Sequence, residues 1–133
     1  MSLVYLDTVG LLALWDQSDQ WHKVAASAFA DMQAAGTTVL TTTYVLIECG
    51  NAAARRPYRN AVDRLRQSLD EAGCLFRPSE SDWLEAWAAY VRGDGGGAGI
   101  VDQISFLVMR RLDIRRAFTN DHHFAAAGFV LLF

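Results

Sequence analysis

The sequence predicts an α/β fold in which a short parallel sheet is covered by helices on both faces. Short apolar runs alternate with longer segments of helical periodicity along the 133 residues, and this alternation is typical of a parallel sheet. The first apolar run, Leu3–Leu6, has no polar face and ends directly before Asp7, as a buried parallel strand would. Because 52% of the residues are hydrophobic and 20% are charged, the chain can form a core of ordinary composition. We expect a single domain over residues 1–133.

Pairs of helices separate the strands in the first half of the chain. The predicted elements are a strand at Leu3–Leu6, helices at Val9–Trp15 and Trp21–Ala35, a strand at Thr38–Thr41, and helices at Thr43–Ala54 and Tyr58–Ala72. Gly36 stands where a glycine commonly ends a helix. The second strand is predicted from its β-branched residues. Pro57 separates the last two helices, because proline breaks a helix interior.

Helices and one glycine-rich segment separate the strands in the second half. The predicted elements are a strand at Cys74–Phe76, helices at Glu80–Val91 and Ile100–Leu112, a strand at Arg116–Thr119, a short helix at His122–Ala127, and a strand at Phe129–Leu132. Trp83, Trp87 and Val91 share one stripe of the first of these helices. The glycine-rich segment Gly93–Gly99 predicts a loop, and Gly128 closes the short helix.

Acidic residues follow the predicted strands at the edge where a parallel sheet binds ligands. Asp7 ends the first strand, Glu48 lies on the helix after the second strand, and Asp121 follows the strand Arg116–Thr119. Ligands of open parallel sheets bind beyond the carboxyl ends of the strands. Chain order alone therefore places these three acids on the ligand-binding side.

Two acids lie on helices that are otherwise apolar. Asp102 is in the first turn of its helix and shares a stripe with Phe106 and Met109, so we expect its carboxylate to point toward the protein. Glu48 shares a face with Tyr44 and Ile47, and we expect it to point inward in the same way.

A cluster of four carboxylates requires a counter-charge. Two carboxylates about 4 Å apart repel each other by roughly 4 kcal/mol at an effective dielectric constant near 20. Either some of the acids are protonated or a divalent cation lies among them. Hard oxygen ligands suit Mg²⁺ or Mn²⁺, which can activate a water for in-line attack on a phosphate.

Each acid also has a structural interpretation that needs no metal. Asp7 and Asp121 could cap the helices that follow them. Asp102 could interact with its helix macrodipole. Glu48 could form one structural salt bridge.

Other conspicuous residues have simpler explanations. His122 and His123 are interpreted as hydrogen-bonded structural groups, because hard cations seldom need imidazole. Arg55, Arg56 and Arg59 flank Pro57 and could contact phosphate groups, or could be solvated helix ends. The four tryptophans are expected in the core or at a dimer interface; they are Trp15, Trp21, Trp83 and Trp87.

Charge and cysteine content limit the classes of function. The net charge of −3 argues weakly against nucleic-acid binding, unless the acids gather in one pocket and a metal neutralises them. Cys49 and Cys74 have neither metal-ligand spacing nor a disulfide framework, and we expect reduced thiols. No apolar run approaches a membrane span, and the first seven residues lack a signal-peptide pattern. We therefore expect a cytoplasmic protein with no membrane contact.

Four segments together resemble the PIN-domain family, and most closely its VapC-type toxin branch. They are Val4-Tyr5-Leu6-Asp7-Thr8, Thr42-Thr43-Tyr44-Val45-Leu46-Ile47-Glu48, Gly99-Ile100-Val101-Asp102-Gln103-Ile104-Ser105-Phe106, and Thr119-Asn120-Asp121-His122-His123-Phe124 with Ala127-Gly128-Phe129. The resemblance implies a three-layer α/β/α sandwich and a Mg²⁺-dependent endoribonuclease. One departure is Gly99, which stands three residues before the third acid, where the family often has serine or threonine.

The resemblance also implies roles and partners. Asp7 and Asp102 would be the main metal ligands, Glu48 and Asp121 would complete the site, and two threonines, Thr8 and Thr119, would orient carboxylates. The toxin branch usually acts on RNA as a dimer and is silenced by a small antitoxin protein.

Two other functions compete with the nuclease. One is a PIN-like binding or regulatory module with weak catalysis, which the Gly99 departure and the net negative charge favour. The other is a small Mg²⁺-dependent phosphatase. Such an enzyme would require a second aspartate two residues after Asp7, where this chain has Val9.

Overall fold

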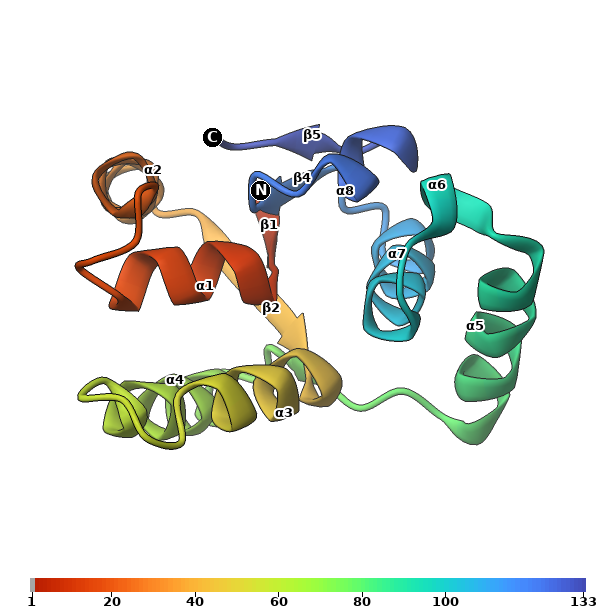
Figure 1. The fold of residues 1–133 in the computed structure, drawn as a ribbon, viewed down its shortest axis with the longest axis horizontal. Coiled ribbons are helices and arrows are strands. Elements are labelled where there is room, and N and C mark those ends of the chain that lie inside the picture. The colour runs from red at the N-terminus through yellow and green to blue at the C-terminus, as the bar shows by residue number, and fades with distance from the viewer. Residues whose placement is uncertain (1) are drawn as a thin grey trace.

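The computed structural model describes residues 2–133 and contains a five-stranded parallel sheet in the order β3-β2-β1-β4-β5 (Figure 1). The elements are β1 (Leu3–Leu6), α1 (Thr8–Trp15), α2 (His22–Ala34), β2 (Thr38–Thr42), α3 (Thr43–Ala52), α4 (Arg59–Glu71), β3 (Leu75–Phe76), α5 (Glu80–Arg92), α6 (Asp94–Gly97), α7 (Ile100–Arg111), β4 (Arg116–Phe118), α8 (His122–Ala126) and β5 (Val130–Leu131).

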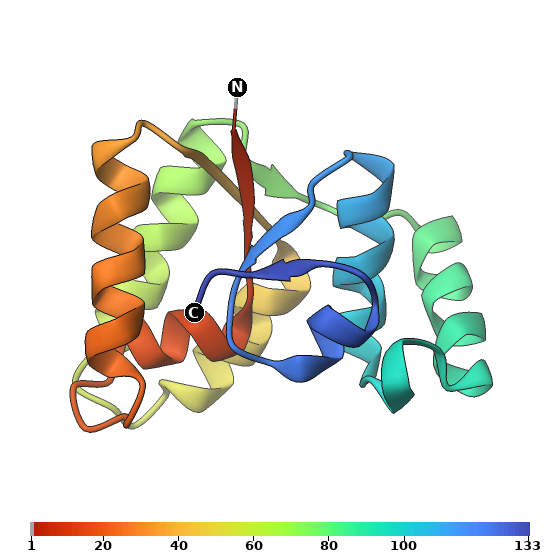
Figure 2. The same ribbon diagram turned by 90° about the horizontal axis from the view of Figure 1, so that it is seen from above.

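The sheet is the middle of three layers. Helices α1 to α4 lie on one side of it and α5 to α8 lie on the other (Figures 1 and 2). Strand β1 is central and pairs with β2 and β4, and its residues Val4, Tyr5 and Leu6 are fully buried. This arrangement confirms the predicted three-layer α/β/α sandwich and explains why the first strand has no polar face.

Several predicted boundaries were too long. The strand predicted at Arg116–Thr119 ends at Phe118, and the last strand is only Val130–Leu131, because β4 and β5 pair at just two positions. The helix predicted to reach Ala54 ends at Ala52. Helix ends vary by one or two residues between criteria, so this last difference is small.

The glycine-rich segment was predicted as a loop, but it contains the single turn α6. Its backbone is left-handed at Gly95 and Gly96, with φ of 64° and 70°, which only glycine adopts readily. The turn is tied to α7, because Nε2 of Gln103 donates to the carbonyl oxygens of Asp94 at 2.8 Å and Ala98 at 3.3 Å. The sequence indicated the glycines, but the contacts with Gln103 depend on the folded chain.

Helix α1 lies so close to β4 that residue 10 must be glycine. A Cβ atom at Gly10 would lie 2.0 Å from the carbonyl oxygen of Phe118.

We expect Gly10→Ala to lower the free energy of unfolding by about 2 kcal/mol or more, because backbone must move to relieve the overlap. Urea unfolding measures the effect. Gly50→Ala is the matched control on α3, where a Cβ meets nothing within 4 Å, and it should stabilise the protein by about 0.5–1 kcal/mol. Equal effects at the two glycines would contradict this packing.

Across residues 2–133, no helix combines the length and the apolar character that a membrane span requires.

Candidate metal centre

Acidic side chains meet beyond the carboxyl ends of β1 and β4. Asp7 follows β1 directly and its side chain is buried, while Asp121 lies three residues after the end of β4. Asp102 approaches from the first turn of α7. One ligand atom each from Asp102, Asp121 and His123 lies within 4.8 Å of the other two. The chain order that predicted this meeting point is therefore reflected in the structure.

Asp7 both caps a helix and faces the other acids. Its Oδ2 accepts hydrogen bonds from the backbone N–H of Val9 at 3.4 Å and from the hydroxyl of Thr119 at 2.8 Å. Asp102 and Asp121 interact electrostatically with the same carboxyl group. The structure confirms that Asp7 caps α1, and the same carboxyl group also interacts with two other acids, so capping does not exclude a metal site.

The cluster makes ionisation of its members costly. Burial, followed by the charge of Asp102, raises the pKa of Asp7 from 3.8 to about 7, although the hydrogen bond from Thr119 opposes the shift. Burial, followed by the charges of Asp121 and Glu48, raises the pKa of Asp102 from 3.8 to about 6. Both groups resist carrying a negative charge, and a cation placed between them would reverse that preference.

The inward orientation expected for Glu48 is wrong. The Glu48 side chain is exposed, and its neighbour Ile47 is 58% exposed. Helical periodicity identified the shared face but could not tell which side the sheet would cover. The carboxylate still belongs to the edge of the cluster: Thr8 donates its hydroxyl to Oε1 of Glu48 at 2.6 Å, and the Glu48 charge raises the pKa of Asp102.

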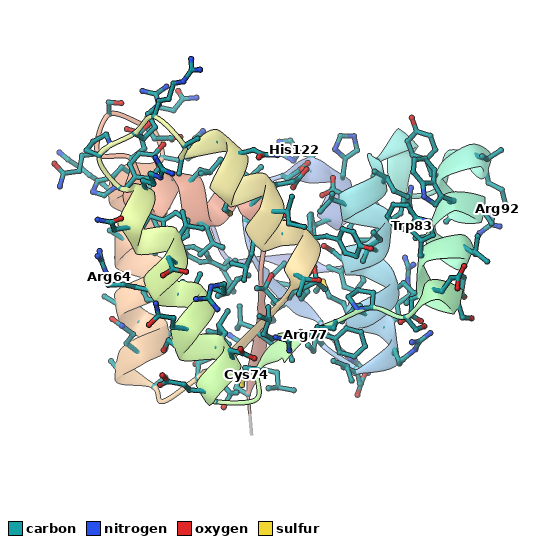
Figure 3. All side chains as sticks on the ribbon, turned by 90° about the horizontal axis from the view of Figure 1, so that it is seen from below. Arg64, Cys74, Arg77, Trp83, Arg92 and His122 are labelled. Carbon is teal, nitrogen blue, oxygen red and sulfur yellow. The ribbon has the colours of Figure 1, made fainter. Side chains whose placement is uncertain are left out.

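His123 lies closer to the acids than the sequence suggested. The backbone N–H of His123 donates to Oδ1 of Asp121 at 2.9 Å, which caps α8, and its ring Nδ1 lies 2.9 Å from the same oxygen. The ring is therefore hydrogen-bonded, as expected, but it is also one of the three groups that could hold a metal. The Asp-x-His spacing was the available signal. His122 is exposed and points away from the core (Figure 3).

The arginines beside Pro57 are not part of the acidic cluster. Arg55, Arg56 and Arg59 are all exposed in or beside the connection between α3 and α4. Arg56 interacts electrostatically with Asp16, which caps the C-terminal end of α1, whereas Asp7 caps the N-terminal end. The eight residues of α1 separate these two ends by about 12 Å at 1.5 Å per residue.

The tryptophans divide between packed and exposed positions. Trp15 stacks on Tyr58, and Trp83 reaches from α5 to stack on Tyr44 of α3 (Figure 3). Trp21 and Trp87 are exposed.

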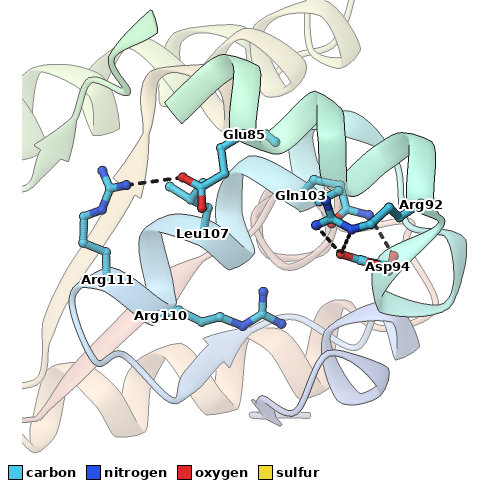
Figure 4. A pocket seen from close by; sticks show the side chains of 9 residues that line it. Glu85, Arg92, Asp94, Gln103, Leu107, Arg110 and Arg111 are labelled. Atoms are coloured by element: carbon cyan, nitrogen blue, oxygen red, sulfur yellow. Dashed lines mark hydrogen bonds and ion pairs between the residues drawn. The ribbon is translucent and has the colours of Figure 1, made fainter. Parts of the chain in front are cut away.

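A cavity of about 390 Å³ lies between α5 and α7, apart from the cluster (Figure 4). Its charged side chains largely pair with one another: Arg92 lies 2.8 Å from Asp94, and Arg111 lies 3.8 Å from Glu85. Asp94 is thus an exposed residue of α6 that forms an ion pair with Arg92. None of the four clustered acids lines this cavity.

The donor atoms of the cluster suit a hard divalent cation. Carboxylate oxygens are the ligands that Mg²⁺ and Mn²⁺ prefer, and a cation beside Asp7 and Asp102 would stabilise the ionised carboxylates, whose pKa values are raised by burial and by neighbouring charges. Thiolate chemistry does not compete, because burial, with the charges of Asp7 and Glu48, raises the pKa of the nearby Cys49 to about 12. Both cysteines are free, as expected.

Comparison with known proteins identifies the family. The PIN domain model matches residues 4–130. The 23S rRNA-specific endonuclease VapC20 of two Mycobacterium tuberculosis strains, CDC 1551 and H37Rv, is 31% identical over 129 residues, which is 96% of this chain and 96% of that protein. The crystal structure of Mycobacterium tuberculosis VapC20, described as a sarcin–ricin loop cleaving toxin, has a TM-score of 0.81 and 30% identity over 97% of both chains. This chain therefore belongs to the PIN-domain family, as its four acidic segments led us to expect.

Proposed function

We propose that this chain is a divalent-metal-dependent endoribonuclease and the toxin of a toxin–antitoxin pair. The observation that carries the proposal is the buried carboxylate of Asp7 facing Asp102 and Asp121 at the carboxyl edge of the sheet. The similarity to an RNA-cleaving toxin along 96% of the chain supports the same conclusion.

Four acids hold the metal in this proposal. Asp7 and Asp102 are the main ligands, as the family resemblance implies, and Glu48 and Asp121 complete the site directly or through waters. Mg²⁺ is the proposed ion, with Mn²⁺ as the alternative. When bound, the cation would neutralise the phosphate charge and lower the pKa of a water.

The protein orients these acids through hydroxyl groups. Thr119 donates to Asp7 and also accepts the backbone N–H of Asp121 at 3.1 Å, so one side chain links two acids. Thr8 donates to Glu48. These hydrogen bonds restrain the carboxylates of Asp7 and Glu48 and the backbone of Asp121.

The proposed substrate is a structured ribosomal RNA loop. This follows the activity of the relative VapC20, which is a 23S rRNA-specific endonuclease. Since RNA in such loops offers unpaired bases and a bent backbone, shape and a few base contacts would select the site. The exposed Arg55, Arg56 and Arg59 are proposed contacts for phosphates flanking the cleaved bond.

RNA cleavage tests the proposal. Purified protein is incubated with total RNA and with a sarcin–ricin loop oligonucleotide, each with Mg²⁺, Mn²⁺ or EDTA. We expect discrete cuts with either metal and none in EDTA. An absence of cleavage with both metals and both RNAs would leave a PIN-like binding module that acts through a protein partner.

A homodimer and a small antitoxin are the proposed partners. The outer face of α5 exposes Leu84, Trp87 and Val91, and apolar side chains of this kind are typical of protein interfaces. A sedimenting mass of one chain, 14.7 kDa, would contradict the homodimer.

A further inference from the structure

Three buried hydroxyl groups meet beneath the acidic cluster. The Tyr5 hydroxyl donates to Oγ1 of Thr42 at 3.2 Å, and Oγ of Ser105 lies 2.7 Å from the same Tyr5 oxygen. Because the single Tyr5 proton is given to Thr42, Ser105 donates to Tyr5. All three residues are fully buried, at 0% exposure. Among residues 2–133, no buried side-chain nitrogen or oxygen lacks a partner, so this triad is fully satisfied.

Each member of the triad belongs to a segment that carries one of the acids. Tyr5 lies on β1, two residues before Asp7 and therefore on the same face of the strand. Ser105 lies on α7, three residues after Asp102 and on the same helix face.

Thr42 supplies the third connection. Its Oγ1 accepts the backbone N–H of Val45 at 3.4 Å and so caps α3, the helix that carries Glu48. One hydroxyl therefore joins the strand of Asp7, the helix of Asp102 and the start of the helix of Glu48.

The hydrogen bonds of this triad hold α7 at one position along β1, which apolar packing alone would not do. A buried hydroxyl without a partner is costly, and its bonds tolerate only a narrow range of distance and angle. Sliding α7 along β1 would break the Tyr5–Ser105 bond and would move Asp102 relative to Asp7 at the same time. Metal ligands lose affinity when groups behind them no longer hold their geometry.

We propose that Tyr5 is a positioning residue, whose hydroxyl sets the spacing between Asp7, Asp102 and Glu48 for a divalent cation. The inference rests on the proposed metal-dependent function. It assigns Tyr5 no contact with the metal or with RNA. The alternative to positioning is a purely structural role, in which the Tyr5 hydroxyl stabilises the core and has no effect on the geometry of the acids.

Tyr5→Phe is the first test, because phenylalanine keeps the ring and removes only the hydroxyl. The readout is the dissociation constant for Mn²⁺, measured by calorimetry on the full chain, with kcat and KM on RNA as a second readout. We expect a folded protein whose Mn²⁺ affinity falls by about tenfold or more, in the range found for groups that support metal ligands. The value of kcat should fall with it, while KM changes little.

Two controls separate positioning from stability. Tyr58→Phe removes a hydroxyl from a ring stacked on Trp15, which lies at the end of α1 opposite Asp7, and should leave Mn²⁺ affinity unchanged. Val62→Ala truncates the core on α4, which carries none of the acids, and should lower the melting temperature without weakening Mn²⁺ binding.

A double-mutant cycle tests whether Tyr5 and Ser105 act through the same hydrogen bond. Ser105→Ala alone should weaken Mn²⁺ binding, and Tyr5→Phe/Ser105→Ala should weaken it no more than the stronger single change, since both break the same bond. Wild-type Mn²⁺ affinity in Tyr5→Phe, or a loss in Val62→Ala that matches it, would overturn the positioning role. If wild type itself binds no Mn²⁺, the proposed function fails instead, and the two failures are thereby distinguished.

Discussion

Asp102→Asn is expected to lower the rate of RNA cleavage by at least about a thousandfold. A bound cation supplies several kcal/mol of charge stabilisation in phosphate chemistry, and each 1.36 kcal/mol is tenfold in rate. The amide keeps the shape of the side chain and removes the charge that attracts the cation. Single-turnover cleavage of the sarcin–ricin oligonucleotide at saturating Mg²⁺ measures the effect.

Asp113→Asn is the matched control for this change. Asp113 is 82% exposed, lies outside the cluster, and has a positive φ of 55° that asparagine tolerates. Its substitution removes the same charge and should leave the rate unchanged. A similar loss in both variants would mean that net charge, and not the acidic cluster, governs cleavage.

The metal-free protein is expected to become less stable as the pH rises from 5 to 8. The folded-state pKa values of Asp7 and Asp102, about 7 and about 6, lie above the unfolded value of 3.8. The stabilisation from these groups is therefore fully present below about pH 4 and is lost as the pH rises through the folded pKa values. Since one pKa unit is about 1.4 kcal/mol, the loss is on the order of a few kcal/mol.

Urea unfolding in EDTA between pH 5 and 8 measures this loss. The carboxyl groups with lowered pKa, such as Asp82 beside Ser79 and Arg111, change stability only below this range. Asp7→Asn should flatten the pH dependence and raise stability at pH 8. Mg²⁺ should reverse the trend in wild type, because binding requires the ionised carboxylates. A wild-type stability that rises steadily with pH in EDTA would contradict the raised pKa values.

The sequence was sufficient to predict the fold and the meeting of the acids at one edge of the sheet. A run without a polar face identified β1, and the carboxyl ends of parallel strands converge wherever the sheet forms, so Asp7 and Asp121 could be placed from chain order. Asp102 could be oriented because it shares its stripe with large core residues.

The remaining features depend on which surfaces the folded chain covers. Periodicity predicted that Glu48 shares a face with Tyr44 and Ile47, but only Tyr44 is covered, by Trp83 of α5, while Ile47 and Glu48 are exposed. Tyr5 resembled an ordinary core residue within an apolar run, because its partners Thr42 and Ser105 lie 37 and 100 residues away.

Gly99, the departure from the family pattern, caps the start of α7 without a side-chain hydrogen bond. A Cβ atom there meets nothing within 4 Å, so a serine would fit. The residue weakens a helix cap and removes no acid from the cluster, which favours retained catalysis over a binding module.

Calorimetric titration with Mn²⁺ at pH 6.5 tests the central claim most directly, on wild type, Asp113→Asn and the double variant Asp7→Asn/Asp102→Asn. We predict saturable binding with proton release in the first two proteins, because carboxyl groups with pKa values near this pH must ionise to bind the metal. We predict no measurable binding in the double variant. Equal binding in all three proteins, or none in wild type, would contradict a metal centre at these acids.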